Sequence, residues 1–187
     1  MKKSHLILIF TVLLAGTAYL AVSSSPKGPQ GPATEVPSQS QLEVETATAP
    51  ASVLPNYTLS DIKGKTNAIH DLAGDKPTLF IYFSSTCHLC QDELGAISKR
   101  IEEFDEYNLI FTTVQPIEEI MGFVTGLGIK DRSNVHFLLD SEMQVAAHLQ
   151  IRSVPSIFVY GVNKELVANY VGITEVDLLK EKLAQGK

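Results

Sequence analysis

Two cysteines constrain this chain more than any other feature, because they are its only two and lie three residues apart. Cys87 and Cys90 follow the apolar run 78–83 and precede a segment with helical periodicity. Peptide N–H groups and the dipole at a helix start stabilise a thiolate, so a C-x-x-C between a strand and a helix is typical of a redox site. The spacing therefore predicts reversible disulfide chemistry.

The place of each residue in that helix predicts a different role. Cys87 lies at or just before the first turn, where the thiolate is favoured, and is expected to be the nucleophile. Cys90 lies one turn further on the same face and is expected to be the more buried, resolving thiol. Glu93 lies another turn along, where burial would raise its pKa and allow it to carry the proton of the resolving thiol. A solvated glutamate in the first turn is the alternative.

The segments around the motif alternate between strand and helix patterns. Apolar runs predict strands at 57–62, 78–83, 109–114, 135–140, 156–160 and 166–171, with a short return strand at 68–72. Helical patterns cover 90–104, 116–127, 142–149 and the segment after 174. Ser141 and Thr174 are expected to cap the last two helices. This order predicts an α/β fold in which helices cover a mixed sheet, with a short N-terminal β-hairpin.

The first 54 residues predict export. Lys2 and Lys3 precede 17 uncharged residues from Leu6 to Val22, which suit an uncleaved membrane anchor at 1–22, a cleaved signal sequence or a buried core helix. Residues 23–54 are rich in Pro, Ser and Thr and lack apolar periodicity, which predicts a disordered linker. We therefore expect a folded domain at 55–187 outside the cytoplasm, on the periplasmic or cell-surface side. It would be anchored in the membrane or, after cleavage, secreted and soluble.

Charge argues against one class of partner. The net charge of −6 lies within residues 55–187, which hold 12 Lys and Arg against 18 Asp and Glu. No basic patch or stripe runs along the sequence, so nucleic acid is not an expected partner.

Four motifs occur in order along the chain. They are Tyr57-x-Leu-x-x-x-x-Gly64, Gly74-Asp75-Lys76-Pro77, Phe83-x-x-x-Cys87-x-x-Cys90-x-x-Glu93 and Ile151-x-x-Val154-Pro155-Ser156. Together, over about residues 55–185, they resemble the TlpA/ResA group of membrane-anchored thiol-disulfide oxidoreductases.

This resemblance implies a thioredoxin-like three-layer fold with a cis Pro155 beside the cysteines. Val154 and Pro155 would grip an extended segment of the partner. It also supports the proton-carrying role of Glu93, and it requires no cofactor beyond a Cys87–Cys90 disulfide. The implied partners are thiols or disulfides of exported proteins and a membrane or periplasmic redox protein. The implied activity is more often reduction than oxidation.

Several residues depart from that pattern or modify it. Thr86 occupies the position where relatives usually have tryptophan, and Gly95 the position where they have proline. Ile81 stands where thioredoxin buries an aspartate, which leaves Glu93 as the nearer group to handle protons. His88 lies between the cysteines and would contact partners; as a cation it would stabilise the Cys87 thiolate. The alternative is an exposed histidine with a small effect.

Three other functions stay open at this point. Cys87, Cys90 and a histidine such as His136 or His148 would bind copper or zinc, although the copper chaperones of this fold use a wider C-x-x-x-C spacing and a closed zinc site needs four ligands. A peroxiredoxin would need a threonine three residues before the reactive cysteine, where Ser84 stands. A binding domain with a structural disulfide is the third alternative, but a bridge over three residues constrains little chain.

Overall fold

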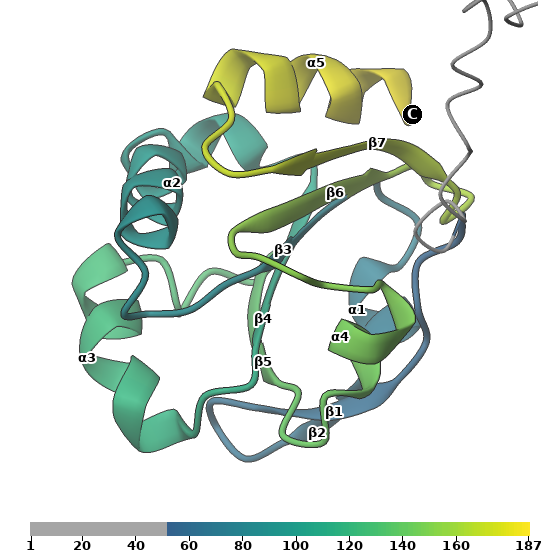
Figure 1. The fold of residues 1–187 in the computed structure, drawn as a ribbon. Helices are drawn as coiled ribbons and strands as arrows, with labels where there is room; N and C mark the ends of the chain where they lie inside the picture. The colour runs from purple at the N-terminus through teal and green to yellow at the C-terminus, as the bar shows by residue number, and fades with distance from the viewer. Residues whose placement is uncertain (1–51) are drawn as a thin grey trace, which may run out of the picture. The chain divides into compact units, whose positions relative to one another are not determined.

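The computed structural model describes residues 52–187, so the predicted anchor at 1–22 and the predicted linker as far as residue 51 lie outside the described part of the chain. Seven strands form one mixed sheet in the order β2-β1-β5-β4-β3-β6-β7 (Figure 1). Parallel strands β3, β4 and β5 form its centre, and β6 runs antiparallel to β3. In chain order the strands are β1 Thr58–Asp61, β2 Thr66–Ala68, β3 Thr78–Tyr82, β4 Asn108–Thr113, β5 Val135–Leu139, β6 Ser156–Tyr160 and β7 Leu166–Val171.

Helices cover both faces of this sheet, which makes three layers. They are α1 Ile69–Ala73, α2 His88–Lys99, α3 Ile117–Leu127, α4 Gln144–His148 and α5 Val176–Gln185, with a 3₁₀ helix at Ile101–Phe104. One apolar core joins the sheet to α2, α3 and α5, and a second core joins its other face to α1 and α4 (Figure 1). The predicted α/β architecture, with helices on both faces and a leading β1–β2 hairpin, is confirmed. None of the helices within residues 52–187 has the length and apolar character needed to cross a membrane.

Strand β3 positions the cysteines. All five of its side chains are buried, because the strand pairs with β4 on one side and β6 on the other and has helices over both faces. A strand with both faces covered reads as a continuous apolar run, as the sequence predicted. The chain leaves β3 at Tyr82, and five residues separate it from His88, the first residue of α2, at the carboxyl end of the parallel strands.

One predicted element type and one predicted helix end are wrong. Residues 69–72 continue as helix α1 and not as a strand, because the Ile69 side chain turns into the second core and its N–H donates to the Tyr57 carbonyl. The helix predicted to reach residue 104 ends as an α-helix at Lys99, and Phe104 reaches the core from the 3₁₀ helix.

The two predicted helix caps are also wrong. The side chain that caps α4 is Asp140, whose carboxylate accepts from the N–H groups of Val145 and Ala146, and Ser141 has no such contact. Thr174 does not cap α5 with its side chain; its N–H instead donates to a carboxylate of α2.

The packed domain begins before Pro55. Val53 forms a bridge with Glu165, and the buried Leu54 donates its N–H to the Lys164 carbonyl. Residues 52–54, which the sequence placed in the linker, therefore pair with the turn between β6 and β7.

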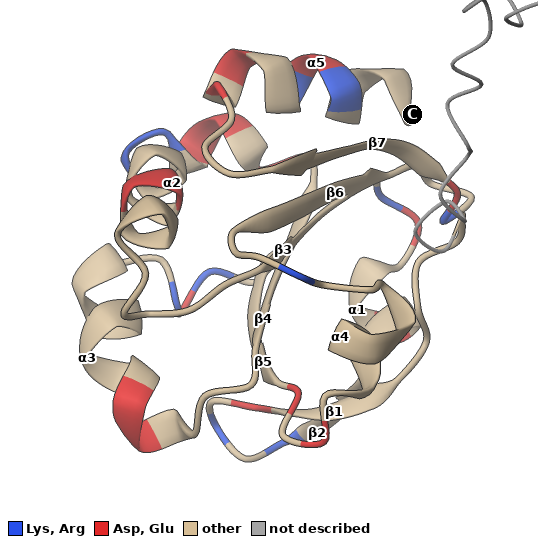
Figure 2. Cartoon of the chain, in the orientation of Figure 1, with Lys and Arg blue, Asp and Glu red and all other residues tan. Residues whose placement is uncertain are grey.

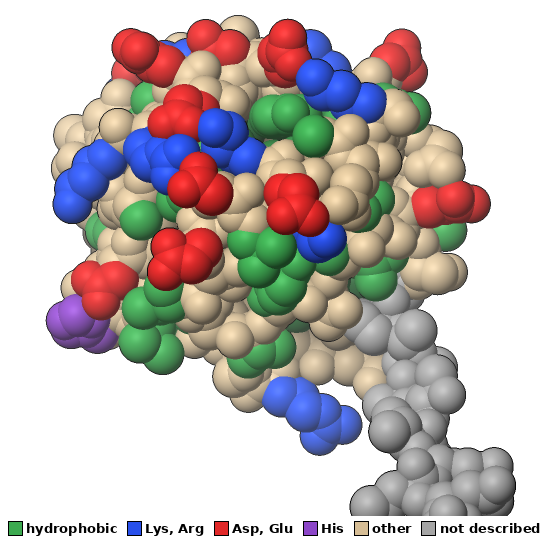
Figure 3. Space-filling model, turned by 90° about the horizontal axis from the view of Figure 1, so that it is seen from above, with side chains coloured by type: hydrophobic (Ala, Val, Ile, Leu, Met, Phe, Trp, Pro, Cys, Tyr) green, Lys and Arg blue, Asp and Glu red, His purple; other side chains and the backbone are tan. Residues whose placement is uncertain are grey.

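The surface seen over α5 carries charges of both signs. Lys and Arg side chains there lie beside Asp and Glu, with apolar side chains between them (Figure 3). Ion pairs that involve residues of α5 include Asp177 with Arg100 and Lys180 with Glu103. This face therefore presents interspersed charges and not a field of one sign.

Candidate redox site

The cysteines lie where the sequence placed them. Cys87 is the N-cap residue of α2, with extended backbone (φ −83°, ψ 120°), and Cys90 lies in the first turn of the helix. The Cys87 side chain is partly exposed and that of Cys90 is fully buried, and both thiols are free. The predicted difference in burial is confirmed.

The pKa values of the two thiols are shifted in opposite directions from the ordinary value of a cysteine. The N–H of Cys90 is the main cause that lowers the pKa of Cys87, with help from the Cys90 thiol and the N–H of Leu89, against a smaller effect of burial. Burial raises the pKa of Cys90 to about 12, and the charges of Cys87 and Glu93 add to this rise. Cys87 is therefore the thiol that ionises first, and Cys90 keeps its proton until a base accepts it.

The start of α2 is free of competing negative charge. The first turn of α2 contains no acidic residue, whereas that of α3 contains Glu118 and Glu119 (Figure 2). The two helices follow the parallel strands β3 and β4, so both begin beyond the carboxyl ends of these strands. Of these two helices, α2 is therefore the one whose positive end remains available to a thiolate.

A loop carrying Pro155 lies opposite Cys87. The Val154–Pro155 peptide bond is cis, and the Cys87 thiol donates to the Val154 carbonyl oxygen at 3.6 Å. The Pro155 carbonyl in turn accepts from the N–H of Gly172 at 2.9 Å, which joins this loop to the end of β7. The expected cis Pro155 beside the cysteines is confirmed.

Glu93 is buried, with no exposed surface. Its Oε2 accepts from the N–H of Thr174 at 2.8 Å, and its Oε1 has no partner within residues 52–187. Burial raises the pKa of Glu93 to about 7, which the Thr174 N–H opposes and the charge of Glu175 increases. The sequence left a buried and a solvated Glu93 open, and the structure shows the buried one, so Glu93 is a carboxyl that can gain and lose a proton near neutral pH.

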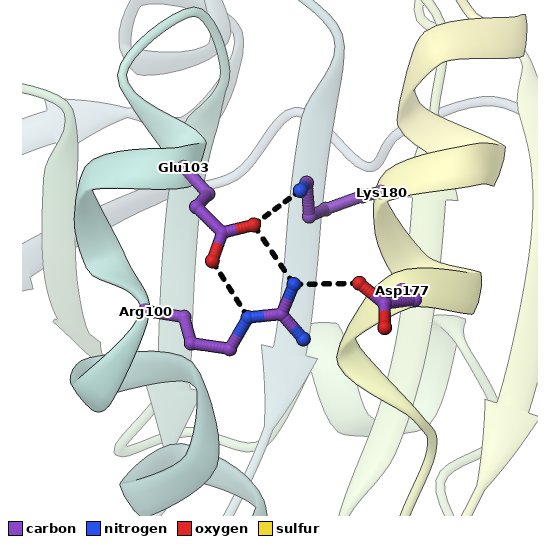
Figure 4. A network of polar contacts seen from close by, with 4 residues as sticks. All are labelled: Arg100, Glu103, Asp177 and Lys180. Carbon is purple, nitrogen blue, oxygen red and sulfur yellow. Dashed lines mark hydrogen bonds and ion pairs between the residues drawn. The ribbon is translucent and has the colours of Figure 1, made fainter.

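A network of exposed ion pairs lies between the end of α2 and the start of α5. Arg100, at the end of α2, contacts Asp177 at 2.5 Å and Glu103 at 2.7 Å, and Lys180 also contacts Glu103 (Figure 4). This exposed network links the end of α2 to the first turns of α5. The buried contact of Glu93 with the Thr174 N–H is a second link between the cysteine helix and the junction of β7 with α5.

The histidines lie outside this cluster. His88 is exposed, and its Nδ1 pairs with Asp92 at 2.8 Å; it is not among the groups that lower the pKa of Cys87. His148 contacts Tyr57, and His136 lines a cavity of about 240 Å³ beside Asp61. Within the described residues no three His, Cys, Asp or Glu side chains are grouped closely enough to hold a metal ion.

The three residues that depart from the family pattern lie in three different settings. Thr86 is exposed, and its hydroxyl contacts that of Ser84 at 3.1 Å. Ile81 is completely buried in the first core. Gly95 lies within the unbroken α-helix α2.

The sequence reasoning missed two glutamines at this site. Gln115 accepts from the N–H of Ser85 at 2.6 Å, and Gln91 donates to the Ser85 carbonyl at 2.8 Å. One signal would have found Gln115, because polar residues directly after a parallel strand lie at the edge where such sheets bind ligands. No pattern in the sequence distinguishes Gln91 from a solvated helix residue.

Comparison with known proteins identifies a family and a fold. The chain matches the AhpC/TSA family over residues 50–169, and no match was found among curated proteins. Among solved structures it is similar to DsbF of Mycobacterium tuberculosis, with 16% identity and a TM-score of 0.63 over 75% of this chain and 100% of that one. It is also similar to the peroxidoxin BcpB of the same organism, with 14% identity and a TM-score of 0.62 over 72% and 96% of the two chains.

A third similar structure is a secreted M. tuberculosis disulfide oxidoreductase, described as homologous to E. coli DsbE, with 16% identity and a TM-score of 0.59 over 70% of this chain and 96% of that one. At these identities the structures show a shared thioredoxin-like fold. The family match spans well over half of the sequence and includes both cysteines, Glu93 and Pro155. The chain therefore belongs to the AhpC/TSA family, with a thioredoxin-like fold.

Proposed function

We propose that this protein is a thiol-disulfide oxidoreductase of the TlpA/ResA kind, which exchanges disulfides with cysteines of exported proteins. One observation carries the proposal: two free thiols one helical turn apart have oppositely shifted pKa values, with a buried carboxyl one turn further on. This arrangement supplies an attacking thiolate, a protected second thiol and a base for its proton.

The first step is attack by Cys87 on a partner disulfide. The Cys87 thiolate bonds to one partner sulfur, the partner S–S bond breaks, and the second partner sulfur leaves as a thiolate that takes up a proton. The Val154 carbonyl contacts the Cys87 thiol in the free protein. In the mixed disulfide it would therefore lie beside the partner residues that flank the attacked cysteine. Val154 and Pro155 are thus proposed to contact the partner, and His88 to lie at the exposed rim.

The second step is resolution by Cys90. Its sulfur attacks Cys87 Sγ, the Cys87–Cys90 bond forms, and the partner leaves with both cysteines reduced, so that two electrons pass from this protein to the partner. The charge of Cys87 is one reason why the pKa of Cys90 is high, and the mixed disulfide removes that charge. Glu93, with a pKa of about 7, is proposed to accept the Cys90 proton.

The surroundings of Cys87 suit a protein partner. Leu89, Val114, Val171 and Ile173 are 40–67% exposed, although all are large and apolar. Leu89 follows the nucleophile by two residues, and Val171 and Ile173 flank Gly172, which contacts Pro155. Exposed apolar side chains grouped in this way are typical of surfaces that bind other proteins.

Location and direction of electron flow are part of the proposal. The expected export segment at 1–22 and the similar secreted oxidoreductase of M. tuberculosis support a site outside the cytoplasm. The resemblance to the TlpA/ResA group supports a reductase. Equilibration with glutathione tests the direction, because a reduction potential far above about −200 mV would identify an oxidant.

Trapping tests the mechanism. Cys90→Ser should accumulate a mixed disulfide between Cys87 and an exported protein, visible as a slower band on non-reducing gels, and Cys87→Ser should abolish exchange. The double variant is the control for non-specific crosslinks. Exchange that persists in Cys87→Ser would overturn the proposal.

A peroxidase is the second candidate, because the AhpC/TSA match and the similarity to the peroxidoxin BcpB both accommodate it. Hydrogen peroxide would oxidise the Cys87 thiolate to a sulfenic acid, with release of water, and Cys90 would then form the disulfide with release of a second water. The Ser84 hydroxyl, three residues before Cys87, contacts Thr86 instead of the Cys87 sulfur. Peroxide consumption much faster than disulfide exchange would favour this candidate.

A further inference from the structure

Ser85 lies in the loop before the nucleophile, and within residues 52–187 neither its backbone N–H nor its backbone C=O is hydrogen-bonded to another backbone group. The residue is 7% exposed, yet it lies outside every helix and strand. Buried N–H and C=O groups require hydrogen bonds. Here both bonds come from side chains: Gln115 Oε1 accepts from the Ser85 N–H at 2.6 Å, and Gln91 Nε2 donates to the Ser85 carbonyl at 2.8 Å.

The two glutamines come from different parts of the fold. Gln91 belongs to α2 and lies one turn after Cys87, whose carbonyl accepts its N–H at 3.0 Å. Gln115 belongs to the connection between β4 and α3, and its Nε2 donates to Glu119 at 3.2 Å. Both the oxygen and the nitrogen of the Gln115 side-chain amide are therefore hydrogen-bonded, which sets the orientation of the amide. The loop is held to the cysteine helix on one side and to the neighbouring strand on the other.

The position of this loop matters for the resolving sulfur. The N–H of Ser84, adjacent to the clamped peptide, donates to Cys90 Sγ at 3.4 Å, and the Ser84 carbonyl accepts the N–H of Cys87 at 3.2 Å. A donor at a sulfur favours its thiolate, which is the attacking form. Cys90 is otherwise buried among apolar side chains, so this N–H is a specific stabiliser of the charge that resolution requires.

We propose that Gln91 and Gln115 are positioning residues for the resolving step: by clamping the Ser85 peptide they keep the Ser84 N–H on Cys90 Sγ when Cys90 attacks the mixed disulfide. The inference rests on the proposed exchange function. The two side chains act in the second step of the exchange and not in the first, because the Cys87 thiolate is stabilised by the N–H groups of Cys90 and Leu89 within α2.

Reaction of the reduced protein with Ellman's reagent, a small aromatic disulfide, separates the two steps. Attack by Cys87 releases one thionitrobenzoate, and attack by Cys90 on the resulting mixed disulfide releases the second, so stopped-flow absorbance shows two phases. Loss of one hydrogen bond to the clamped peptide should slow the second phase of Gln115→Ala by about tenfold and leave the first within about twofold of the wild type. Gln91→Ala should behave in the same way.

Two further variants separate positioning from general stability. The exchanged pair Gln115→Glu with Glu119→Gln keeps an acceptor for the Ser85 N–H and a donor toward residue 115, and should restore the second phase. Gln185→Ala, which removes an exposed glutamine contact with Glu181, is the matched control and should change neither phase. Thermal unfolding of each variant confirms that it is folded at the temperature used. If Gln115→Ala itself does not fold, Gln91→Met replaces it; this variant is similar in size, removes the donor to the Ser85 carbonyl and adds no negative charge near Cys87.

The outcomes are distinct. Equal slowing of both phases, or no slowing of the second, would overturn the clamp while the exchange function stands. A wild-type protein that releases only one thionitrobenzoate would instead overturn the proposed exchange function, because Cys90 would then not resolve the mixed disulfide.

Discussion

Two buried carboxylates on opposite sides of the sheet show how the same chemical group serves structure in one place and reactivity in another. Asp140 accepts three hydrogen bonds, from the Tyr82 hydroxyl at 2.9 Å and from the N–H groups of Val145 and Ala146. Glu93 accepts one, from Thr174, and its second oxygen has no partner in the described part of the chain. Both residues have no exposed surface.

The difference lies in the donors and not in the burial. Three donors satisfy the Asp140 carboxylate and make it a fixed cap for α4. A single donor leaves Glu93 under-solvated, so its pKa rises to about 7 and the group binds and releases a proton easily. Burial of a carboxylate therefore does not by itself predict reactivity; the number of donors around it does.

The largest expected effect is on stability, from Asp140→Ala. This change leaves the Tyr82 hydroxyl and two helix N–H groups buried without partners, which should lower the free energy of unfolding by about 3 kcal/mol. Chemical denaturation measures the loss. Both phases of the Ellman reaction should keep their rates at temperatures where the variant is folded, and a selective loss of the second phase would contradict the comparison.

Glu93→Gln should change both stability and reactivity. The folded protein binds this proton more tightly than the unfolded chain, since the pKa rises from 4.5 to about 7. The stabilising effect of protonation is therefore fully present below about pH 4.5, and it is lost as the pH rises through about 7, at a cost of about 3 kcal/mol. Denaturation across this range should show the fall in wild type and its absence in Glu93→Gln.

The same variant lacks a base for the Cys90 proton, so its second Ellman phase should slow by about tenfold or more at pH 7. Glu175→Gln, which removes a neighbouring charge but leaves the Glu93 carboxyl, is the matched control and should only lower the pKa of Glu93. An unchanged second phase in Glu93→Gln would return Glu93 to a structural role.

Tyr82→Phe removes one of the three donors to Asp140. It should cost about 1 kcal/mol, the contribution of one buried hydrogen bond, since the two helix N–H groups remain. Burial and Asp140 raise the pKa of the Tyr82 hydroxyl, so it should not titrate below pH 10 in ultraviolet absorbance. A loss as large as that of Asp140→Ala would mean that the helix N–H groups contribute little.

Arg100→Ala should have the smallest effect. The contacts of Arg100 with Glu103 and Asp177 are exposed, and exposed ion pairs contribute little and are screened by salt (Figure 4). We expect the midpoint of thermal unfolding to fall by roughly 2 °C or less at low ionic strength and to match wild type at 1 M salt. If Arg100→Ala instead strongly changed the pH dependence of stability that we assign to Glu93, the network would be shown to hold the Thr174 amide in place.

The sequence alone determined the layered α/β fold and the redox pair. The continuous apolar run of β3 and the helical spacing from Cys90 to Ile97 are local patterns set by burial, and the C-x-x-C needs only a strand end and a helix start. The position of Pro155 opposite the cysteines came from resemblance to a family and not from a local pattern.

Only the tertiary structure decided how the polar groups are paired. Thr174 and Ser141 are good N-cap residues by type, yet the Thr174 N–H donates to Glu93, 81 residues earlier, and Asp140 caps α4 in place of Ser141. Residues 69–72 became helical because Ile69 turns into the second core. The burial of Glu93 and the clamp of Gln91 and Gln115 on Ser85 likewise depend on α5 and the β4–α3 connection meeting α2. Hydrogen bonds between residues distant in the sequence leave no periodic signal, so these features emerge only once the chain has folded.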